Sequence, residues 1–411
     1  MRTRRGLMCL SIAALLATLA STTASASELP LGSRSLDERR ERVTVATGVR
    51  WTSIVREGGP WRVNALAIDR ARATGAVSGL LSNNRIAGLE RPSAMARRTS
   101  ATAGVNGGFF AADGDPVGAL AVGGRLLSEP VGGRSALIVP SDPAQPVRVA
   151  RTEFAGVVRA GGEGRLVDGV ERERGFVPAC GGRGGDRPTQ RPNSALTCTD
   201  SSELVMLSPR YGKTPPSTGS EALLRGGQVT RLGPASGRRV PSGALLLSGS
   251  GGAADFLSRA LSVGSRPDVE VAVNAGGEPL ALAGAALVTG GGPRLVTRGR
   301  ISVAARPEGF APLEAPGFFG SFVASRQPRT LAGVRADGRL LLVTVDGRRP
   351  GWSAGVTLRE AARVMRSLGA RDALNLDGGG STAMVIRGEL VSRPSDPSGE
   401  RAVSDGIFLL P

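Results

Sequence analysis

Residues 340–382 read LLLVTVDGRRPGWSAGVTLREAARVMRSLGARDALNLDGGGST and carry the strongest local pattern in the chain. The continuous apolar run Leu340–Val345 predicts a buried strand. Thr357 followed by Glu360 fits a capping box, and apolar residues then recur at helical spacing. Ala373–Leu376 predicts a second buried strand. We therefore expect a strand, a helix, a second strand and then a glycine loop.

The glycine loop is the most specific feature of this region. It reads Asn375-Leu-Asp377-Gly378-Gly379-Gly380-Ser381-Thr382. Three glycines permit a sharp turn and close approach of a ligand, and successive amides in such a turn can bind an anion. No lysine follows and a strand is expected next, so this is not a Walker loop. Asp377 is our first candidate for a catalytic carboxylate; the alternative is a tight turn that needs glycine only for its geometry.

Two other groups of residues are less specific candidates for a binding site. Asn106-Gly107-Gly108-Phe109-Phe110 suits contact with hydroxyl or phosphate groups, although an Asn-Gly β-turn explains it equally well. Arg329 and Arg348 lie beside apolar strands and glycine turns, and the fork of an arginine matches phosphate oxygens. Asp346 follows the first predicted strand and is the second carboxylate candidate.

The composition excludes several kinds of active site. The 411 residues include no His, 52 Lys+Arg against 35 Asp+Glu (net +17) and 60 Gly. Without His, Ser-His and Cys-His nucleophiles and His-based zinc sites are impossible, so catalysis must use carboxylates, hydroxyls, arginines or amides. All basic residues except Lys213 are arginines, dispersed without interleaved aromatics, which argues against nucleic-acid binding. Polyanion binding driven by net charge is a rival interpretation, and its signature is steep salt dependence.

The N-terminus has the layout of a secretory signal peptide. Three early arginines precede the apolar stretch Leu7–Ala20, and Ala24-Ser25-Ala26 forms a small-x-small cleavage site. The stretch is too short to span a bilayer, and no other run predicts a membrane span. We expect cleavage after Ala26, secretion to the extracellular space or cell wall, and a net charge of +14 on residues 27–411.

Cleavage would leave two cysteines, Cys180 and Cys198. In an oxidising compartment they most simply form one disulfide, worth about 3 kcal/mol. Without His or CxxC spacing they make a poor metal site. We predict no metal or cofactor, although Asp113 and Asp115 leave open an oxygen-ligated cation such as calcium, without a loop signature for it.

Short apolar runs separated by Gly, Pro and Asn predict an α+β fold with β-rich mixed sheets and few helices. We expect a flexible leader over residues 27–43 and a surface insertion at about 157–220. The other expected strands are Val43–Ala46, Trp61–Ile68, Ala103–Val105, Leu120–Val122, Ala136–Val139, Leu204–Leu207, Ala244–Leu247 and Val269–Val273.

Taken in series, these segments resemble the phosphodiester glycosidase family. The matching stretches are Ala103–Phe110, Gly290–Pro293, Arg329–Thr330, Leu340–Arg348, Ser353–Leu358, Asn375–Thr382 and Glu400–Val403. They fall in order along residues 44–411, which the resemblance implies to be a single domain. Two departures stand out: residues 157–220 have no counterpart, and Arg329 lies in Ser-Arg-Gln-Pro-Arg-Thr-Leu-Ala-Gly, where the family has a more regular Arg-Thr-Ala-Val-Gly pattern.

The resemblance implies a hydrolase that cleaves a sugar-1-phosphodiester, such as a GlcNAc-1-phosphodiester, at the glycosidic bond in cell-wall or extracellular glycopolymers. Asp377 and Asp346 would then be the catalytic carboxylates, and arginines would stabilise the phosphate leaving group. The implied substrate-binding residues are Asn106, Gly107, Gly108, Arg329, Arg348, Asn375, Gly378, Gly379, Gly380, Ser381, Thr382 and Arg401. The alternative is a non-catalytic cell-wall or exopolysaccharide-binding protein on the same fold. Nothing in the sequence indicates an oligomeric state.

Overall fold

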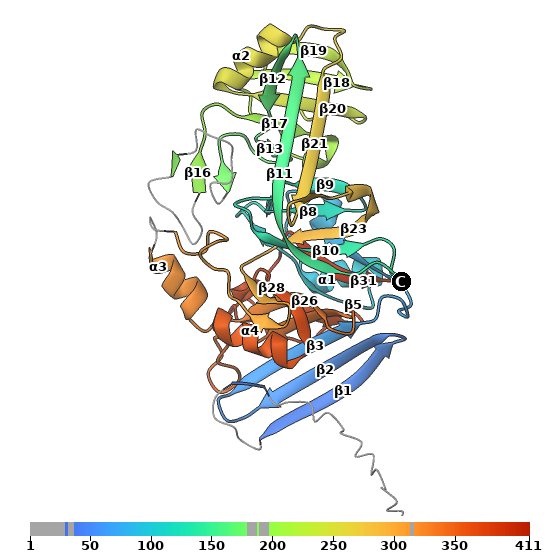
Figure 1. The fold of residues 1–411 in the computed structure, drawn as a ribbon, viewed down its shortest axis with the longest axis vertical. Helices are drawn as coiled ribbons and strands as arrows, with labels where there is room; N and C mark the ends of the chain where they lie inside the picture. Colours follow the sequence, from blue (N-terminus) through green and yellow to red (C-terminus); the bar gives the residue numbers. More distant parts are fainter. Residues whose placement is uncertain (1–28, 32–36, 179–186, 189–196, 313–315) are drawn as a thin grey trace, which may run out of the picture.

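The computed structural model describes residues 29–31, 37–178, 187–188, 197–312 and 316–411. Figure 1 shows an elongated molecule in three parts. The strands β1–β3 lie at one end, a lobe around helix α2 lies at the other, and the body between them contains the segments singled out in the sequence.

The largest sheet is antiparallel and continues from the body into β1–β3, with the strand order β1-β2-β3-β27-β26-β28-β24-β25. Because β26 pairs with both β27 and β28, these two strands run parallel to each other without pairing. Helix α4 connects them, as the strand–helix–strand pattern predicts. The bounds are β1 (Glu38–Ala46), β2 (Val49–Arg56), β3 (Trp61–Ile68), β24 (Arg294–Thr297), β25 (Arg300–Ile301), β26 (Arg329–Arg335), β27 (Leu340–Val345), β28 (Ala370–Asn375) and α4 (Leu358–Ser367).

A five-stranded antiparallel sheet packs on one face of the large sheet, in the order β30-β29-β5-β31-β4. Leu342 and Leu374 of the large sheet share one core with Val105 and Ile407 of the smaller one. Helix α1 covers the outer face of the smaller sheet. The bounds are β4 (Ala76–Leu81), α1 (Pro92–Thr99), β5 (Ala103–Asn106), β29 (Met384–Ile386), β30 (Glu389–Leu390) and β31 (Asp405–Leu410), with η1 (Ser82–Asn84) after β4 and η5 (Gly379–Ser381) before β29.

Helix α4 covers the opposite face of the large sheet. Its buried residues Ala361 and Met365 pack on Leu331 and Val343. The predicted capping box is confirmed: the Thr357 hydroxyl accepts from the Glu360 amide at 3.1 Å, and the Glu360 carboxylate accepts from the Thr357 amide at 2.9 Å. The short helix α3 (Pro316–Phe318) and η4 (Phe319–Ala324) lie beside α4.

A third sheet joins the body to the lobe, in the order β22-β21-β11-β10-β23-β8-β9, with β12 paired to β11. The long strands β11 and β21 continue out of the body into the lobe, which is at the top of Figure 1. There a five-stranded sheet, β13-β17-β20-β18-β19, packs with α2 around its own core. The bounds are β8 (Leu120–Val122), β9 (Arg125–Ser128), β10 (Ser135–Pro140), β11 (Arg148–Ala160), β12 (Glu163–Leu166), β13 (Gly169–Val170), β17 (Leu204–Leu207), η2 (Pro209–Tyr211), β18 (Ser220–Arg225), β19 (Gln228–Pro234), β20 (Ala244–Gly249), α2 (Gly251–Ala260), β21 (Asp268–Ala275), β22 (Glu278–Pro279), η3 (Leu282–Gly284) and β23 (Ala285–Gly290).

Two small strand groups complete the fold. Strands β6 (Phe109–Phe110) and β7 (Pro116–Val117) form a pair, and β14 (Val177–Pro178), β15 (Arg187–Pro188) and β16 (Thr197–Thr199) form a three-stranded group. Cys198 lies in β16 and is buried. Cys180 lies outside the described residues, so its disulfide with Cys198 stays a prediction. The predicted signal peptide also lies outside the described residues.

The predicted α+β class with many strands and few helices is confirmed. One predicted boundary is wrong. The leader was expected to reach residue 43, but β1 begins at Glu38, because its backbone pairs with β2 along its whole length despite a charged sequence. The insertion at about 157–220 stays a prediction; the lobe that contains these residues continues to β21, because β18, β19 and β20 complete the sheet that β13 and β17 begin.

The capping box generates a prediction. Thr357→Ala removes the acceptor for the Glu360 amide at the start of α4 and should lower the free energy of unfolding by about 1 kcal/mol. Thermal or urea unfolding followed by circular dichroism measures the change. Arg363→Ala, at an exposed position of the same helix, is the control and should change stability by less than about 0.5 kcal/mol. Equal stability of the two variants would contradict a stabilising cap.

Candidate functional site

A buried amide joins four segments at one edge of the large sheet. The side chain of Asn106, at the end of β5, is fully buried. Its nitrogen donates to the carbonyl of Asp377 at 2.8 Å. Its oxygen accepts from the Thr330 hydroxyl of β26 at 2.6 Å and from the amide of Ala383 at 3.1 Å. The geometry therefore favours a positioning role for Asn106, and its direct contact with substrate stays a prediction.

The glycine segments of the sequence meet at the same place. The amide of Gly107 donates to the carbonyl of Asp405 at 2.9 Å, and a Cβ on Gly107 would overlap the Asp405 carboxylate. A Cβ on Gly108 would lie 2.7 Å from the carbonyl oxygen of Gly290, and one on Gly291 would overlap the carbonyl oxygen of Asn375. Two weak motifs, at Asn106–Phe110 and Gly290–Pro293, thus pack closely against each other and against the specific Asn375–Thr382 loop, which only glycine permits.

Asp377 lies two residues after the end of β28 and is partly exposed. Its Oδ1 accepts from the amide of Gly378 at 2.9 Å. Burial raises the pKa of Asp377 to about 6; hydrogen bonds from Ser381 and Gly378 and the charge of Arg401 oppose that shift. The neighbouring Asp405 carboxylate raises this pKa further. Asp377 is therefore a carboxylate at neutral pH and becomes protonated just below it, which suits a group that takes part in proton transfer or charge stabilisation.

Two exposed arginines flank the Gly378–Gly380 turn. Arg401 lies 3.5 Å from the Ser381 hydroxyl and forms an ion pair with Asp396 at 2.7 Å. Arg348 donates from its Nε to the Oε1 of Gln327 at 2.5 Å. A Cβ on Gly379 would lie 3.3 Å from the Arg348 guanidinium, so this side chain lies over the turn. Both guanidinium groups are placed to meet an anion beside Asp377.

Arg329 occupies a different environment. Its side chain is 1% exposed and donates to the main-chain carbonyls of Val356, Phe322 and Ser325, at 3.2, 2.5 and 3.3 Å. Burial, with a smaller contribution from nearby Arg348, lowers the pKa of Arg329 to about 10. These contacts hold η4 against the large sheet. The geometry favours a structural role, and direct contact of Arg329 with phosphate stays a prediction.

Asp346 lies at the same edge of the sheet as Asp377, because β27 and β28 flank β26. Its side chain is buried, and its Oδ2 accepts from Trp352 Nε1 at 2.8 Å and from the amide of Arg393 at 3.1 Å. Burial raises the pKa of Asp346 to about 6, against the opposing hydrogen bond from Trp352. These contacts join the turn after β27 to the loop before Arg401. Asp346 is thus placed to position that loop.

The remaining predicted residues are mostly internal. The Asn375 side-chain nitrogen donates to the carbonyls of Gly292 and Leu376 at 3.0 and 2.6 Å. Ser381 and Thr382 are buried, and Thr382 Oγ1 has no hydrogen-bond partner in the described part of the chain. The exposed chemistry of the site therefore lies in Asp377 and the two flanking arginines.

Asp405 was missed by the sequence reasoning. It begins β31 and is 4% exposed; its Oδ1 accepts from the amide of Gly108 at 3.2 Å and its Oδ2 from the Ser404 hydroxyl at 2.6 Å. Burial raises the pKa of Asp405 above its ordinary value. A carboxylate at the boundary of a buried strand is the same signal that selected Asp346 and Asp377, so the sequence did carry it.

The described residues contain no group of three or more His, Cys, Asp or Glu side chains that could hold a metal ion. Asp113 instead forms an ion pair with Lys213 and accepts from the amide of Asp115 at 3.1 Å. Within the same described part of the chain, no helix is both long and apolar enough to cross a membrane.

Comparison with known proteins confirms the resemblance to the phosphodiester glycosidase family, whose model matches residues 218–410. An N-acetylglucosamine-1-phosphodiester alpha-N-acetylglucosaminidase of Mus musculus is 40% identical over 80 residues, which are 20% of this chain and 15% of the mouse protein. The prophage-derived uncharacterized protein YomE of Bacillus subtilis is 40% identical over 84 residues, 20% of this chain and 13% of that protein. The chain thus spans only a small part of these curated relatives.

Solved structures support the fold over most of the chain. A crystal structure of a Burkholderia pseudomallei protein thought to be exported has a TM-score of 0.81 and 29% identity, and the similarity covers 94% of this chain and 98% of that one. A hypothetical protein from Synechocystis has a TM-score of 0.71 and 24% identity, covering 90% of this chain and 64% of that one, which shows the fold alone.

The close approach at Gly107 generates a prediction. Gly107→Ala places a methyl group on the Asp405 carboxylate and should lower the free energy of unfolding by about 1–3 kcal/mol. Chemical denaturation measures this loss. Gly284→Ala is the matched control, because a Cβ there has open space and its backbone conformation is not left-handed. A Gly107 variant as stable as the Gly284 variant would show that this packing is not required.

Proposed function

Starting from the phosphodiester glycosidase match over residues 218–410, we propose that this protein hydrolyses a sugar-1-phosphodiester at the glycosidic bond. The observation that carries the proposal is that Asp377 and two exposed arginines, Arg401 and Arg348, lie at the same glycine turn. A carboxylate and two cations beside an open backbone turn suit a substrate that develops positive charge on its sugar and negative charge on its phosphate.

The reaction assigned to this site separates charge at one bond. The bond between the anomeric carbon and the phosphodiester oxygen breaks, its electron pair leaves with the phosphate, and water supplies hydroxide to the carbon and a proton to the medium. The products are a free sugar and a phosphomonoester. A phosphate needs little protonation to leave, so the arginines can stabilise its charge electrostatically. The carboxylate of Asp377 stabilises the oxocarbenium-like carbon, as nucleophile or as base for water.

Three buried residues near Asp377 and Arg401 act indirectly, by holding these two side chains and their loops in position. The Asn106 amide fixes the carbonyl of Asp377, and Asp405 lies against Gly107 behind the turn. Asp346 holds the loop that leads to Arg401 through its contact with the amide of Arg393. We assign these three as positioning residues.

We further propose that the protein acts after secretion, on glycopolymers of the cell wall or the extracellular space. The signal-peptide pattern ending at Ala26 supports export, as does the similarity to a Burkholderia pseudomallei protein thought to be exported. N-terminal sequencing of protein recovered from the medium should begin at Ser27. Recovery of full-length protein inside the cells alone would contradict export.

Asp377→Asn tests the carboxylate directly. The variant should lose at least about a hundredfold in kcat/KM on a GlcNAc-1-phosphodiester, because the neutral amide cannot stabilise positive charge or take a proton. Asp255→Asn, at an exposed position of α2 in the lobe, should leave activity unchanged. Equal activity of Asp377→Asn and wild type would remove Asp377 from the chemistry, and saturable binding without product from wild type would favour the non-catalytic alternative.

The raised pKa of Asp377 predicts an acid limb in the rate profile. Below pH about 6 the carboxyl becomes protonated, so kcat/KM should fall about tenfold for each further pH unit. Asp346 has a similar pKa but a positioning role, so Asp346→Asn should keep this acid limb while lowering stability. If the acid limb disappeared in Asp346→Asn, Asp346 would be the catalytic carboxylate and Asp377 the positioning residue.

Hydrolysis in ¹⁸O-labelled water identifies the bond that breaks. Cleavage at the anomeric carbon leaves the phosphomonoester unlabelled, so its phosphorus NMR signal should show no isotope shift. A shifted signal would show attack at phosphorus and would overturn the glycosidase assignment.

A further inference from the structure

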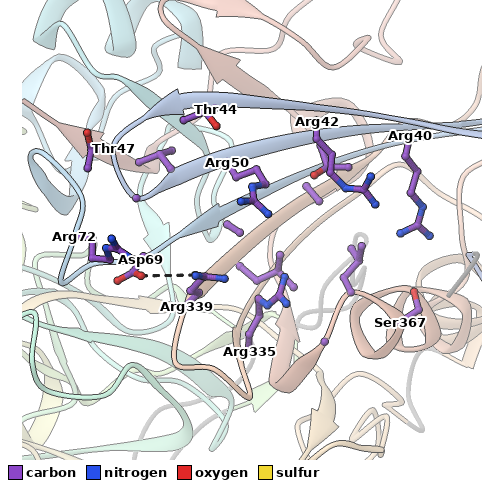
Figure 2. Close-up of a pocket in the computed structure, with 18 residues that line it drawn as sticks. Arg40, Arg42, Thr44, Thr47, Arg50, Asp69, Arg72, Arg335, Arg339 and Ser367 are labelled. Carbon is purple, nitrogen blue, oxygen red and sulfur yellow. Dashed lines mark ion pairs between the residues drawn. The ribbon is translucent and has the colours of Figure 1, made fainter. Parts of the chain in front are cut away.

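An arginine-lined groove of about 520 Å³ lies on the large sheet away from Asp377. Its size is typical of sites for organic ligands rather than for single ions. Figure 2 shows arginines from β1 and β2 along one side and, along the other, arginines from the chain after β3, from the end of β26 and from the β26–β27 turn. The six lining arginines are Arg40, Arg42, Arg50, Arg72, Arg335 and Arg339, and Asp69 is the one acidic lining residue.

Strand periodicity builds this groove. Arg42 and Thr44 point to the same face of β1, and their cross-strand partners on β2 are Thr52 and Arg50. On the next strand, Ala67 is the partner of Arg50. The groove is therefore lined by small side chains such as Ala67 together with arginine and threonine side chains. No aromatic side chain is among the lining residues of the described chain, so the groove is built to recognise charge rather than to stack on neutral sugar rings.

Half of the cationic charge in the groove is not neutralised. Arg40 forms an ion pair with Glu38, Arg335 pairs with Asp337, and Arg339 pairs with Asp337 and with Asp69. In contrast, Arg42, Arg50 and Arg72 are exposed and have no ion pair in the described part of the chain. Exposed surface arginines usually lie scattered, and mutual repulsion of three uncompensated cations in one concavity favours an anionic ligand there.

The groove and the candidate active site lie at opposite ends of the same strands. Arg329 begins β26 next to the glycine turn, whereas Arg335 ends it in the groove. Six residues of strand separate them by about 20 Å. One small phosphodiester cannot occupy both places, but a polymer with repeated charges can.

We propose that this groove is a second binding site, which holds a phosphodiester-linked glycan chain at a distance from the bond that is cleaved. The choice of polymer rests on the proposed function, whereas the charge and shape of the groove do not. Arginine forks bind phosphate oxygens two at a time, and threonine hydroxyls at the groove can bind oxygens between them. The groove would raise the affinity for polymer without taking part in hydrolysis.

The test uses a double variant that removes two unpaired cations, Arg42→Gln with Arg50→Gln. The matched control is Arg238→Gln with Arg239→Gln, an exposed pair in the lobe that removes the same charge. Calorimetric titration with a purified poly(glycosyl phosphate) of defined length measures the Kd of each protein. The groove variant should bind about tenfold more weakly or worse, whereas the control should bind like wild type. Circular dichroism and the melting temperature confirm that both variants are folded.

Two further measurements separate the alternatives. A phosphate-free polyanion of equal charge density, polygalacturonate, should compete poorly with the phosphodiester polymer; equal competition would overturn the phosphodiester assignment. The groove variant should hydrolyse a small GlcNAc-1-phosphodiester at the wild-type rate. Equal Kd values for the groove and control variants would overturn the site itself. If wild type hydrolyses no small substrate but groove-dependent polymer binding persists, the proposed function fails and the second site stands.

Discussion

The site depends on close backbone packing around the side chain of Asn106. This amide is fully buried and satisfies hydrogen bonds to the ends of three other segments, so it cannot be replaced by an apolar group without leaving their polar atoms unpaired. Around it, Gly107, Gly108 and Gly291 allow main chains to approach at distances that a Cβ would forbid. This arrangement fixes the position of Asp377, because the Asn106 amide donates a hydrogen bond to the Asp377 carbonyl. The rigidity of the site thus comes from the backbone.

The arginines of this histidine-free chain divide by burial. The buried guanidinium of Arg329 donates to three main-chain carbonyls and holds η4 against the large sheet. Arg401 and Arg348 keep their guanidinium groups at the surface beside the glycine turn. A third set, typified by Arg42 and Arg50, lines a groove at the far end of the same sheet. One residue type therefore supplies structural, candidate catalytic and candidate binding groups, and only the surroundings of each side chain distinguish them.

Local patterns predicted the elements near the site well. The run Leu340–Val345 is a strand with those bounds, and the helix begins after Thr357 as its capping box indicates. These features depend on neighbours within a few residues, which the sequence displays directly. Asp405 lies at the boundary of a buried strand, a signal that the sequence displays, but its contact with Gly107 joins residues far apart in the chain and could not be predicted. Arg329 was predicted to contact phosphate, and its burial favours a structural role; the sequence could not show this burial, since exposure of an arginine depends on segments that fold over it.

By itself, the amino-acid sequence determined the strand–helix–strand order of residues 340–382, the specific glycine loop with Asp377, and the exclusion of histidine chemistry. Each of these is a property of composition or of residues close in the chain. Only the tertiary structure decided that the Asn106 side chain is buried between several segments and that the Asp405 carboxylate packs against the Gly107–Gly108 backbone. It also decided that Arg401 is exposed beside the glycine loop whereas Arg329 is buried. Burial and ion pairing depend on contacts between strands that are distant in sequence, and a local sequence pattern does not predict these contacts.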